Sequence, residues 1–271
     1  GVATEKMKPL TIVFPYRPNP LWKRSLLALL RTDLVERAIV IRPREMPLEP
    51  IQGTLIIEGG LTEQATLDRI FVETRTPWLL VSLRGAGTAI MPSTLERALR
   101  LAESKRVGLL YSDFYEVSEE GRWLYPLNDY QFGSVRDDFD FGDTVLISVS
   151  AARNGFERHG PIPAVRFAGF YDLRLKLSID YRLYHLREPF YTAFKAENHF
   201  RGPCSDEERF AYVDPRQESV QKEMETVFTN YLRKIGAYLP PETLRDPEPI
   251  LEPFPVEASV VIPVRNRKET L

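Results

Sequence analysis

The sequence predicts an α/β fold in which a mixed, mainly parallel β-sheet is flanked by helices. Roughly the first hundred residues alternate short runs of β-branched residues with amphipathic segments that begin at helix-capping residues. This alternation is typical of parallel strands joined by helices. The composition agrees, because 43% hydrophobic and 27% charged residues are ordinary for a globular chain, and 271 residues suffice for a sizeable core.

Strands are predicted where short apolar runs end at turn-forming residues. They span residues 10–14, 38–41, 54–57, 78–83, 107–112 and 145–149. Helices are predicted where a capping residue precedes apolar residues at helical spacing. Asn19 with Pro20 predicts the start of a first helix, Thr62 the start of a second through Thr74, and the capping box of Ser93 and Glu96 a third through Ser104. An amphipathic segment at 172–177 predicts a fourth helix. Asp214 with Pro215 predicts the start of a fifth, which Gly236 ends.

Two segments far apart in the chain share a pattern. Residues 11–19 and 259–267 align without a gap as a hydroxyl residue, three apolar residues, Pro, one further residue and Arg. Between them, residues 239–257 are rich in proline, which favours an extended linker. We therefore expect one domain at 1–238 and the first strand of a second, truncated domain at 258–271, so that the natural protein would carry two related domains in tandem.

Charge and composition exclude several classes of function. The net charge of -2 supplies no basic field for nucleic acid, and no apolar run reaches the ~20 residues of a membrane helix. The single Cys204 excludes an intramolecular disulfide, and the histidines lack zinc-ligand spacing. No nucleophile motif supports hydrolase chemistry. The N-terminus lacks the apolar region of a signal peptide, so we expect a cytoplasmic location, with the inner face of the membrane as an alternative.

Candidate ligand-binding residues follow the predicted strands. Ligands of open α/β sheets bind outside the carboxyl ends of the strands. Those positions hold Pro15, Tyr16, Arg17, Arg42, Glu58, Arg84 and Asp113. Arg84 begins the sequence Arg-Gly-Ala-Gly, whose glycines allow close backbone approach, and it could neutralise a diphosphate, or it is simply an exposed loop arginine. Asp113 could bind a ribose or a metal, or it caps the strand end through an Asx turn.

Candidate bases come from two acidic segments. Asp137, Asp138, Asp140 and Asp143, with Asp129 nearby, form the densest carboxylate cluster, and such crowding raises the pKa of a potential base. The alternative for this cluster is a solvated acidic loop. Asp172 is either a catalytic base or the cap of its own helix.

The segment at 259–267, Ser-Val-Val-Ile-Pro-Val-Arg-Asn-Arg, resembles the opening of the family 2 glycosyltransferases. The first domain resembles the same family more distantly over most of residues 10–194. Segment 109–116 is similar to the family's stretch ending in Tyr-Ser-Asp. Segment 160–177 is similar to its stretch from a glycine turn into the Glu-Asp helix, and 184–191 to the strand and turn that follow. Segment 136–142 is similar to a bacterial subgroup of such two-domain proteins.

The resemblance implies a GT-A-like fold and inverting transfer of a sugar from a nucleotide sugar to a glycan or other acceptor. Residues 10–113 would be the nucleotide-binding half, 114–203 the acceptor half and 214–236 a C-terminal helix. Pro15, Tyr16, Arg17, Arg84 and Asp113 would bind the nucleotide sugar. Asp113 would also hold a divalent cation, Mn²⁺ or Mg²⁺. Asp138 and Asp172 would be the candidate bases.

Three positions depart from the family pattern. Ser82-Leu83-Arg84 stands where the family has its metal-binding DxD motif, Arg42 lies near the position of an acid that contacts the uridine, and Phe170 aligns with the catalytic Asp. These departures leave a second hypothesis open. In it, the domain is catalytically inactive and binds an acceptor or scaffolds the neighbouring, active glycosyltransferase domain.

Overall fold

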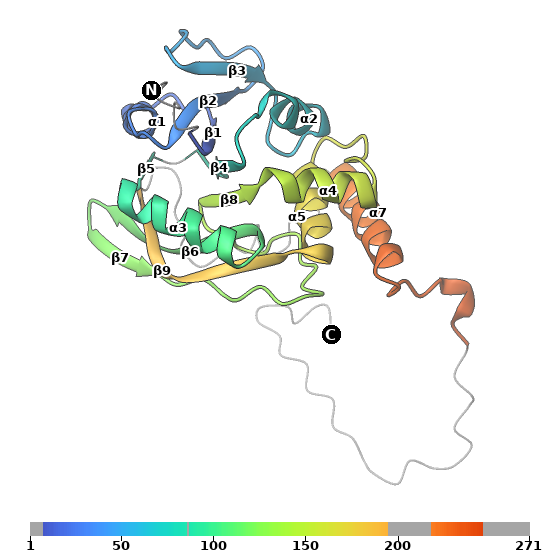
Figure 1. Ribbon diagram of the computed structural model, residues 1–271. Helices are drawn as coiled ribbons and strands as arrows, with labels where there is room; N and C mark the ends of the chain where they lie inside the picture. Colours follow the sequence, from blue (N-terminus) through green and yellow to red (C-terminus); the bar gives the residue numbers. More distant parts are fainter. Residues whose placement is uncertain (1–7, 86, 195–217, 246–271) are drawn as a thin grey trace, which may run out of the picture. The chain divides into compact units, whose positions relative to one another are not determined.

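The computed structural model describes residues 8–85, 87–194 and 218–245, and Figure 1 shows their helices and strands. Contacts divide the chain into two units, at 1–238 and 239–271. The described part of the second unit contains a short 3₁₀ helix, Pro241–Thr243. The predicted linker beyond residue 245 and the predicted strand at 258–271 lie outside the described residues.

The described part of the first unit forms one nine-stranded sheet in the order β3-β2-β1-β4-β8-β6-β9-β5, with β7 also paired to β6. The strands are β1 Leu10–Pro15, β2 Val35–Arg42, β3 Thr54–Glu58, β4 Trp78–Ser82, β5 Gly87–Ala89, β6 Val107–Ser118, β7 Gly121–Tyr125, β8 Thr144–Ser148 and β9 Arg182–Phe194. Strands β1–β4, β6 and β9 run in one direction, and β5, β7 and β8 run in the other.

Helices cover both faces of this sheet (Figure 1). They are α1 Pro20–Leu30, α2 Gln64–Glu73, α3 Pro92–Ser104, α4 Val149–His159, α5 Gly169–Asp180 and α7 Glu218–Lys234. Helices α1 and α3 pack with one set of strand residues, whereas α2, α4 and α5 pack with the alternate set on the other face. The predicted fold class, a mixed and mainly parallel sheet flanked by helices, is confirmed by this arrangement, and its GT-A-like character stays a prediction. Among the described residues, no helix has the length and apolar character to cross a membrane.

The predicted start of α1 is confirmed. Asn19 caps the helix, because its side chain accepts a hydrogen bond of 2.7 Å from the Trp22 amide, and Pro20 occupies the first helical turn. Trp22 is buried, and its indole Nε1 donates to the Pro15 carbonyl at 2.7 Å. These bonds fix the first turn of α1 against the carboxyl end of β1.

Two predicted caps are wrong. Helix α2 begins after Glu63 with no side-chain cap, and Thr62 instead donates its hydroxyl hydrogen to the Arg166 carbonyl at 2.9 Å. Helix α3 begins at Pro92, one residue before the predicted cap Ser93, because the fixed φ of proline suits the first helical position.

Helix α4 and strands β5 and β7 were not predicted, and some predicted elements have other ends in the structure. Helix α4 follows β8 directly, and Ser148, expected inside a strand, is its N-cap, with Gly160 as the C-cap. Those two residues were a usable sequence signal. Strand β6 continues six residues past its predicted end, to Ser118, because it pairs there with both β7 and β9. Helix α7 is described from Glu218 onward, so the predicted cap at Asp214 lies outside the described residues.

Helix α7 is attached to the sheet domain by a buried apolar contact and by one carboxylate. Val227 and Tyr231 pack against α5. Glu223 accepts hydrogen bonds from three consecutive amides just before α5, those of Arg166, Phe167 and Ala168, at 2.6–3.3 Å. These amides would otherwise be unsatisfied donors near a helix terminus.

We expect Glu223→Gln to lower the free energy of unfolding by about 1–3 kcal/mol, because a neutral amide oxygen replaces a carboxylate that accepts several amide bonds. Urea denaturation measures this change. Glu225→Gln, at an exposed position on the same helix, is the matched control and should stay within about 0.5 kcal/mol of wild type. Equal effects of the two substitutions would contradict this account of Glu223.

Candidate functional site

The carboxyl ends of β1 and β2 border a cleft of about 940 Å³. Its walls come from the turn between β1 and α1, the end of β2 and the proline-rich loop that follows. The lining residues include Tyr16, Arg17, Lys23, Arg42 and Glu49. A cleft of this size at the carboxyl edge of parallel strands is the expected place for a small ligand in an open α/β sheet.

The cleft offers cationic and aromatic groups. Arg17, Lys23 and Arg42 line it, and Tyr16 packs edge-on against Trp22 with ring centroids 5.0 Å apart. Arg42 pairs with Glu58 at the end of β3, whereas its Nε is buried and has no hydrogen-bond partner among the described residues. Phosphate groups and a planar ring are the ligand features that such side chains bind.

The turn after β4 reaches the same edge. Arg17 donates from Nε to the Arg84 carbonyl at 3.2 Å, so the two residues are in contact. Gly85 has a φ of +67°, and a Cβ there would lie 2.8 Å from the Pro15 carbonyl oxygen. Only glycine suits this approach of the β4 turn to the end of β1. The structure thus brings Pro15, Arg17 and Arg84 together beside Tyr16. Tyr16 and Arg17 line the cleft, whereas Pro15 and Arg84 are not among its lining residues.

Arg84 is not a free loop arginine. Its guanidinium pairs with Asp140 at 2.9 Å, and 40% of its side chain is exposed. Asp140 also accepts a bond from the Gly142 amide at 2.9 Å. The turn that precedes β8 therefore orients the Arg84 side chain.

Asp143 contacts the turn after β4, and its burial was not predicted. It is 2% exposed, so a solvated acidic loop is the wrong description for this member of the cluster. Its carbonyl accepts the Leu83 amide at 2.7 Å, and its Oδ2 lies 3.4 Å from the Ser82 hydroxyl. Burial raises the pKa of Asp143 to about 6, although the nearby positive charge of Arg84 acts to lower this pKa. Its Oδ1 is buried without a partner among the described residues.

Asp113 lies elsewhere, inside β6. The strand continues beyond it to Ser118, so the expected Asx turn at a strand end is wrong. Its Oδ1 accepts the Leu127 amide at 2.8 Å and lies 2.9 Å from His185 Nε2. It therefore serves to hold the segment after β7, and it is not among the residues that line the cleft.

Metal binding by Asp113 stays a prediction. Residues 8–85, 87–194 and 218–245 contain no group of three or more His, Cys, Asp or Glu side chains placed to hold an ion.

The two predicted bases have different surroundings. Asp138 is exposed, and Arg136 binds both of its oxygens at 2.7–2.8 Å, which lowers the pKa of the carboxyl. Asp172 is buried on α5 and pairs with Lys176 at 2.5 Å; its burial raises the pKa of Asp172. The cap of α5 is Ala168, so the expected capping role of Asp172 is wrong. Neither carboxylate is among the residues lining the cleft.

No family model matches the sequence, and no curated protein matches it. Among solved structures, S. aureus TarS 1–349 is similar with a TM-score of 0.49 and 12% identity, over 86% of this chain and 72% of that one. Its complex with UDP-GlcNAc gives a TM-score of 0.48 at 12% identity, over 84% and 73%. The 2-C-methyl-D-erythritol 4-phosphate cytidylyltransferase from Thermus thermophilus gives 0.40 at 14%, over 67% and 89%. Likenesses this remote assign neither a family nor a function.

Asp143→Asn should change how stability depends on pH. The carboxyl has a pKa of about 6 in the folded protein, compared with about 4 in an unfolded chain. The folded state binds this proton more tightly, so the group contributes stability below about pH 4 that is lost as the pH rises through about 6. The unfolding free energy of wild type minus that of the variant should therefore fall by about 2 kcal/mol between pH 4 and pH 7.

Urea denaturation at a series of pH values measures this difference. Asp137→Asn, at an exposed position on the same loop, is the control. A difference for Asp143→Asn that stays constant over this range would show that the carboxyl is not buried as described.

Proposed function

We propose that this chain binds a nucleotide sugar at the carboxyl edge of β1, β2 and β4 and transfers the sugar, with inversion, to a glycan or other acceptor. The observation that supports it is the contact of Arg17 with Arg84 beside the cleft that Tyr16 and Arg42 line. Guanidinium groups stabilise the negative charge of a leaving diphosphate, and the cleft has room for the nucleoside. Family 2-like chemistry, a bacterial source and a second domain in the natural protein are parts of this proposal.

The residues at the turn after β4 do not fit a divalent cation. Mn²⁺ and Mg²⁺ need oxygen ligands, usually carboxylates, whereas this turn presents the guanidinium of Arg84. A guanidinium can instead supply the positive charge directly. We therefore propose that Arg17 and Arg84 bind the diphosphate without a metal.

Inverting transfer also needs a carboxylate that accepts the proton of the attacking hydroxyl. Asp138 is the better candidate, because its side chain is 62% exposed and an acceptor can reach it. Asp172 is enclosed in its ion pair with Lys176, and only 8% of its side chain is exposed. Under this proposal Asp172 stabilises α5 and takes no proton from substrate.

One observation favours a second candidate function. Arg136 already occupies both oxygens of Asp138 and lowers the pKa of the carboxyl, which weakens it as a base. A domain without a competent base would bind the nucleotide sugar or the acceptor without turnover, and would position it for the predicted neighbouring domain.

We expect the purified chain to bind at least one of UDP, GDP and dTDP in the micromolar range in isothermal titration calorimetry, equally well with EDTA and with Mn²⁺. Arg17→Ala and Arg84→Ala should each weaken binding by about tenfold or more, because each removes a charge-assisted contact to phosphate. Arg100→Ala, on the exposed face of α3, is the control. Folded protein that binds none of the three would refute the proposed function, and a strict need for Mn²⁺ would refute the role of the arginines.

Asp138→Asn tests catalysis. We expect it to lower the rate of nucleoside diphosphate release from a bound donor, in the presence of an oligosaccharide panel, by about 100-fold or more, with donor affinity unchanged. Asp137→Asn, an exposed neighbour, should retain the wild-type rate. If wild type binds the donor but releases no nucleoside diphosphate, the binding function replaces this proposal. If Asp138→Asn is fully active, another residue is the base.

A further inference from the structure

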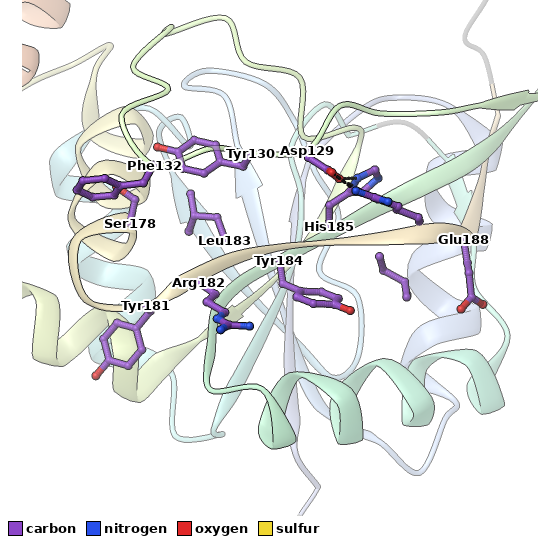
Figure 2. A pocket seen from close by; sticks show the side chains of 12 residues that line it. Asp129, Tyr130, Phe132, Ser178, Tyr181, Arg182, Leu183, Tyr184, His185 and Glu188 are labelled. Atoms are coloured by element: carbon purple, nitrogen blue, oxygen red, sulfur yellow. Dashed lines mark hydrogen bonds and ion pairs between the residues drawn. The ribbon is translucent and has the colours of Figure 1, made fainter.

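A second cleft, of about 680 Å³, runs along β9, and none of its lining residues also lines the first cleft. It is bordered by the segment after β7 and by the end of α5. Aromatic and charged side chains line it, among them Tyr130, Phe132, Tyr181, Arg182, Tyr184 and Arg187. Figure 2 shows Tyr130 and Phe132 on one side of β9, and Arg182 and Tyr184 on the other side.

One wall of this groove is held in place by buried polar groups. His185 has 6% of its side chain exposed and lies between two carboxylates, with Nδ1 2.7 Å from Asp129 and Nε2 2.9 Å from Asp113. Its ring stacks on Tyr111 at 4.8 Å, nearly parallel. Arg187 also binds Asp129, and both contacts lower the pKa of the Asp129 carboxyl to about 2. The wall is therefore arranged before any ligand arrives.

The backbone of the same wall is fixed as well. The Tyr111 hydroxyl donates to the Asn128 carbonyl at 2.7 Å and accepts the Tyr130 amide at 2.6 Å. This segment has no regular secondary structure, yet both of these bonds tie it to β6. These bonds position Tyr130 at the groove.

The chemistry of the groove suits a neutral, polyhydroxylated ligand. Its lining residues include two cationic side chains, Arg182 and Arg187, and two anionic ones, Asp129 and Glu188. Arg187 is paired with Asp129, and Glu188 with Arg97. Paired groups of this kind still offer hydrogen-bond sites but attract no net charge. Phe132 has 66% of its surface exposed, so its ring is accessible to a ligand.

We propose that this groove is a saccharide-binding site that takes a neutral oligosaccharide. Ring faces of Phe132 and Tyr184 pack against the apolar faces of sugar rings, and Arg182 and the Arg187–Asp129 pair bind hydroxyl groups. The lining residues of β9 run from Arg182 to Glu188, which is about 20 Å of extended chain. That length accommodates several linked sugars rather than one.

An extended peptide is the competing occupant. Among the described strands, residues Arg182 to Leu186 of β9 pair only with β6, so the other edge of this stretch is open. Peptides add to open sheet edges of this kind. The edge is guarded, however, by Arg182, Arg187 and Glu188 and ends at Pro189, and such residues oppose strand addition. The balance of features therefore favours the saccharide.

This site does not depend on donor binding. If the proposed function is correct, the saccharide is part of the acceptor chain, held outside the donor cleft. If the domain has no transferase activity, the groove still binds saccharide.

Isothermal titration calorimetry of the 271-residue chain with four oligosaccharides tests the proposal. The four are maltohexaose, cellohexaose, chitohexaose and xylohexaose. We expect binding of at least one, weakened about tenfold or more by Tyr184→Ala and by Phe132→Ala. Phe132 is largely exposed, so its replacement leaves the core intact. Trp123→Ala, an exposed aromatic on β7, is the matched control and should bind like wild type.

Nucleotide titration of the same variants separates the two sites, because groove variants should keep wild-type nucleotide affinity. Folded protein that binds none of the four oligosaccharides overturns the proposal. It is also overturned if binding is insensitive to both groove substitutions, or if the groove takes an extended peptide in place of the sugars. None of these outcomes bears on donor binding at Arg17 and Arg84.

Discussion

Strand β8 is the constraint on which the rest of this structure depends. It joins β4 to β6, and thereby connects the parallel strands β1–β4 to the strands that carry the second cleft. All of Thr144–Ser148 is buried. Because Ser82 pairs with Thr144, the residue before β8 falls directly against the turn after β4. That residue is Asp143, so the pairing of two central strands determines where a buried carboxyl meets Arg84.

Helix α5 shows how this fold uses ionisable residues as interior supports. Asp172, Arg174 and Lys176 are all buried on it, although alternate positions of a surface helix would face water. Arg174 donates to the Arg136 carbonyl and lies over the Tyr171 ring at 4.7 Å. Lys176 donates to the Pro161 carbonyl at 2.7 Å. Arg174 and Lys176 therefore each donate to a loop carbonyl, and Asp172 is paired with Lys176 on the same helix. Removing either member of that pair would leave the other charge uncompensated.

Local signals predicted much of the fold, whereas long-range contacts decided the site. Asn19 with Pro20 marks α1, and apolar runs mark β1 and β4, because capping and burial act over a few residues. Arg17 and Arg84 could be placed at one edge because parallel strands end together. The environment of Asp143 depends on a partner 61 residues away. His185 likewise meets Asp113 across 72 residues, which no spacing rule reveals.

The residues proposed to bind a ligand and the residue proposed to accept a proton differ in how firmly their surroundings hold them. The groups for an anionic ligand are supported at each level: Gly85 permits the close approach of the turn, Asp140 orients Arg84, and Trp22 fixes the end of β1. The carboxylates lack equivalent support, since Asp138 is held by an arginine two residues away on an exposed loop. Preorganised groups lose less freedom when they act on a ligand. Under the proposed function, Arg17 and Arg84 are therefore better preorganised to bind a ligand than Asp138 is to accept a proton.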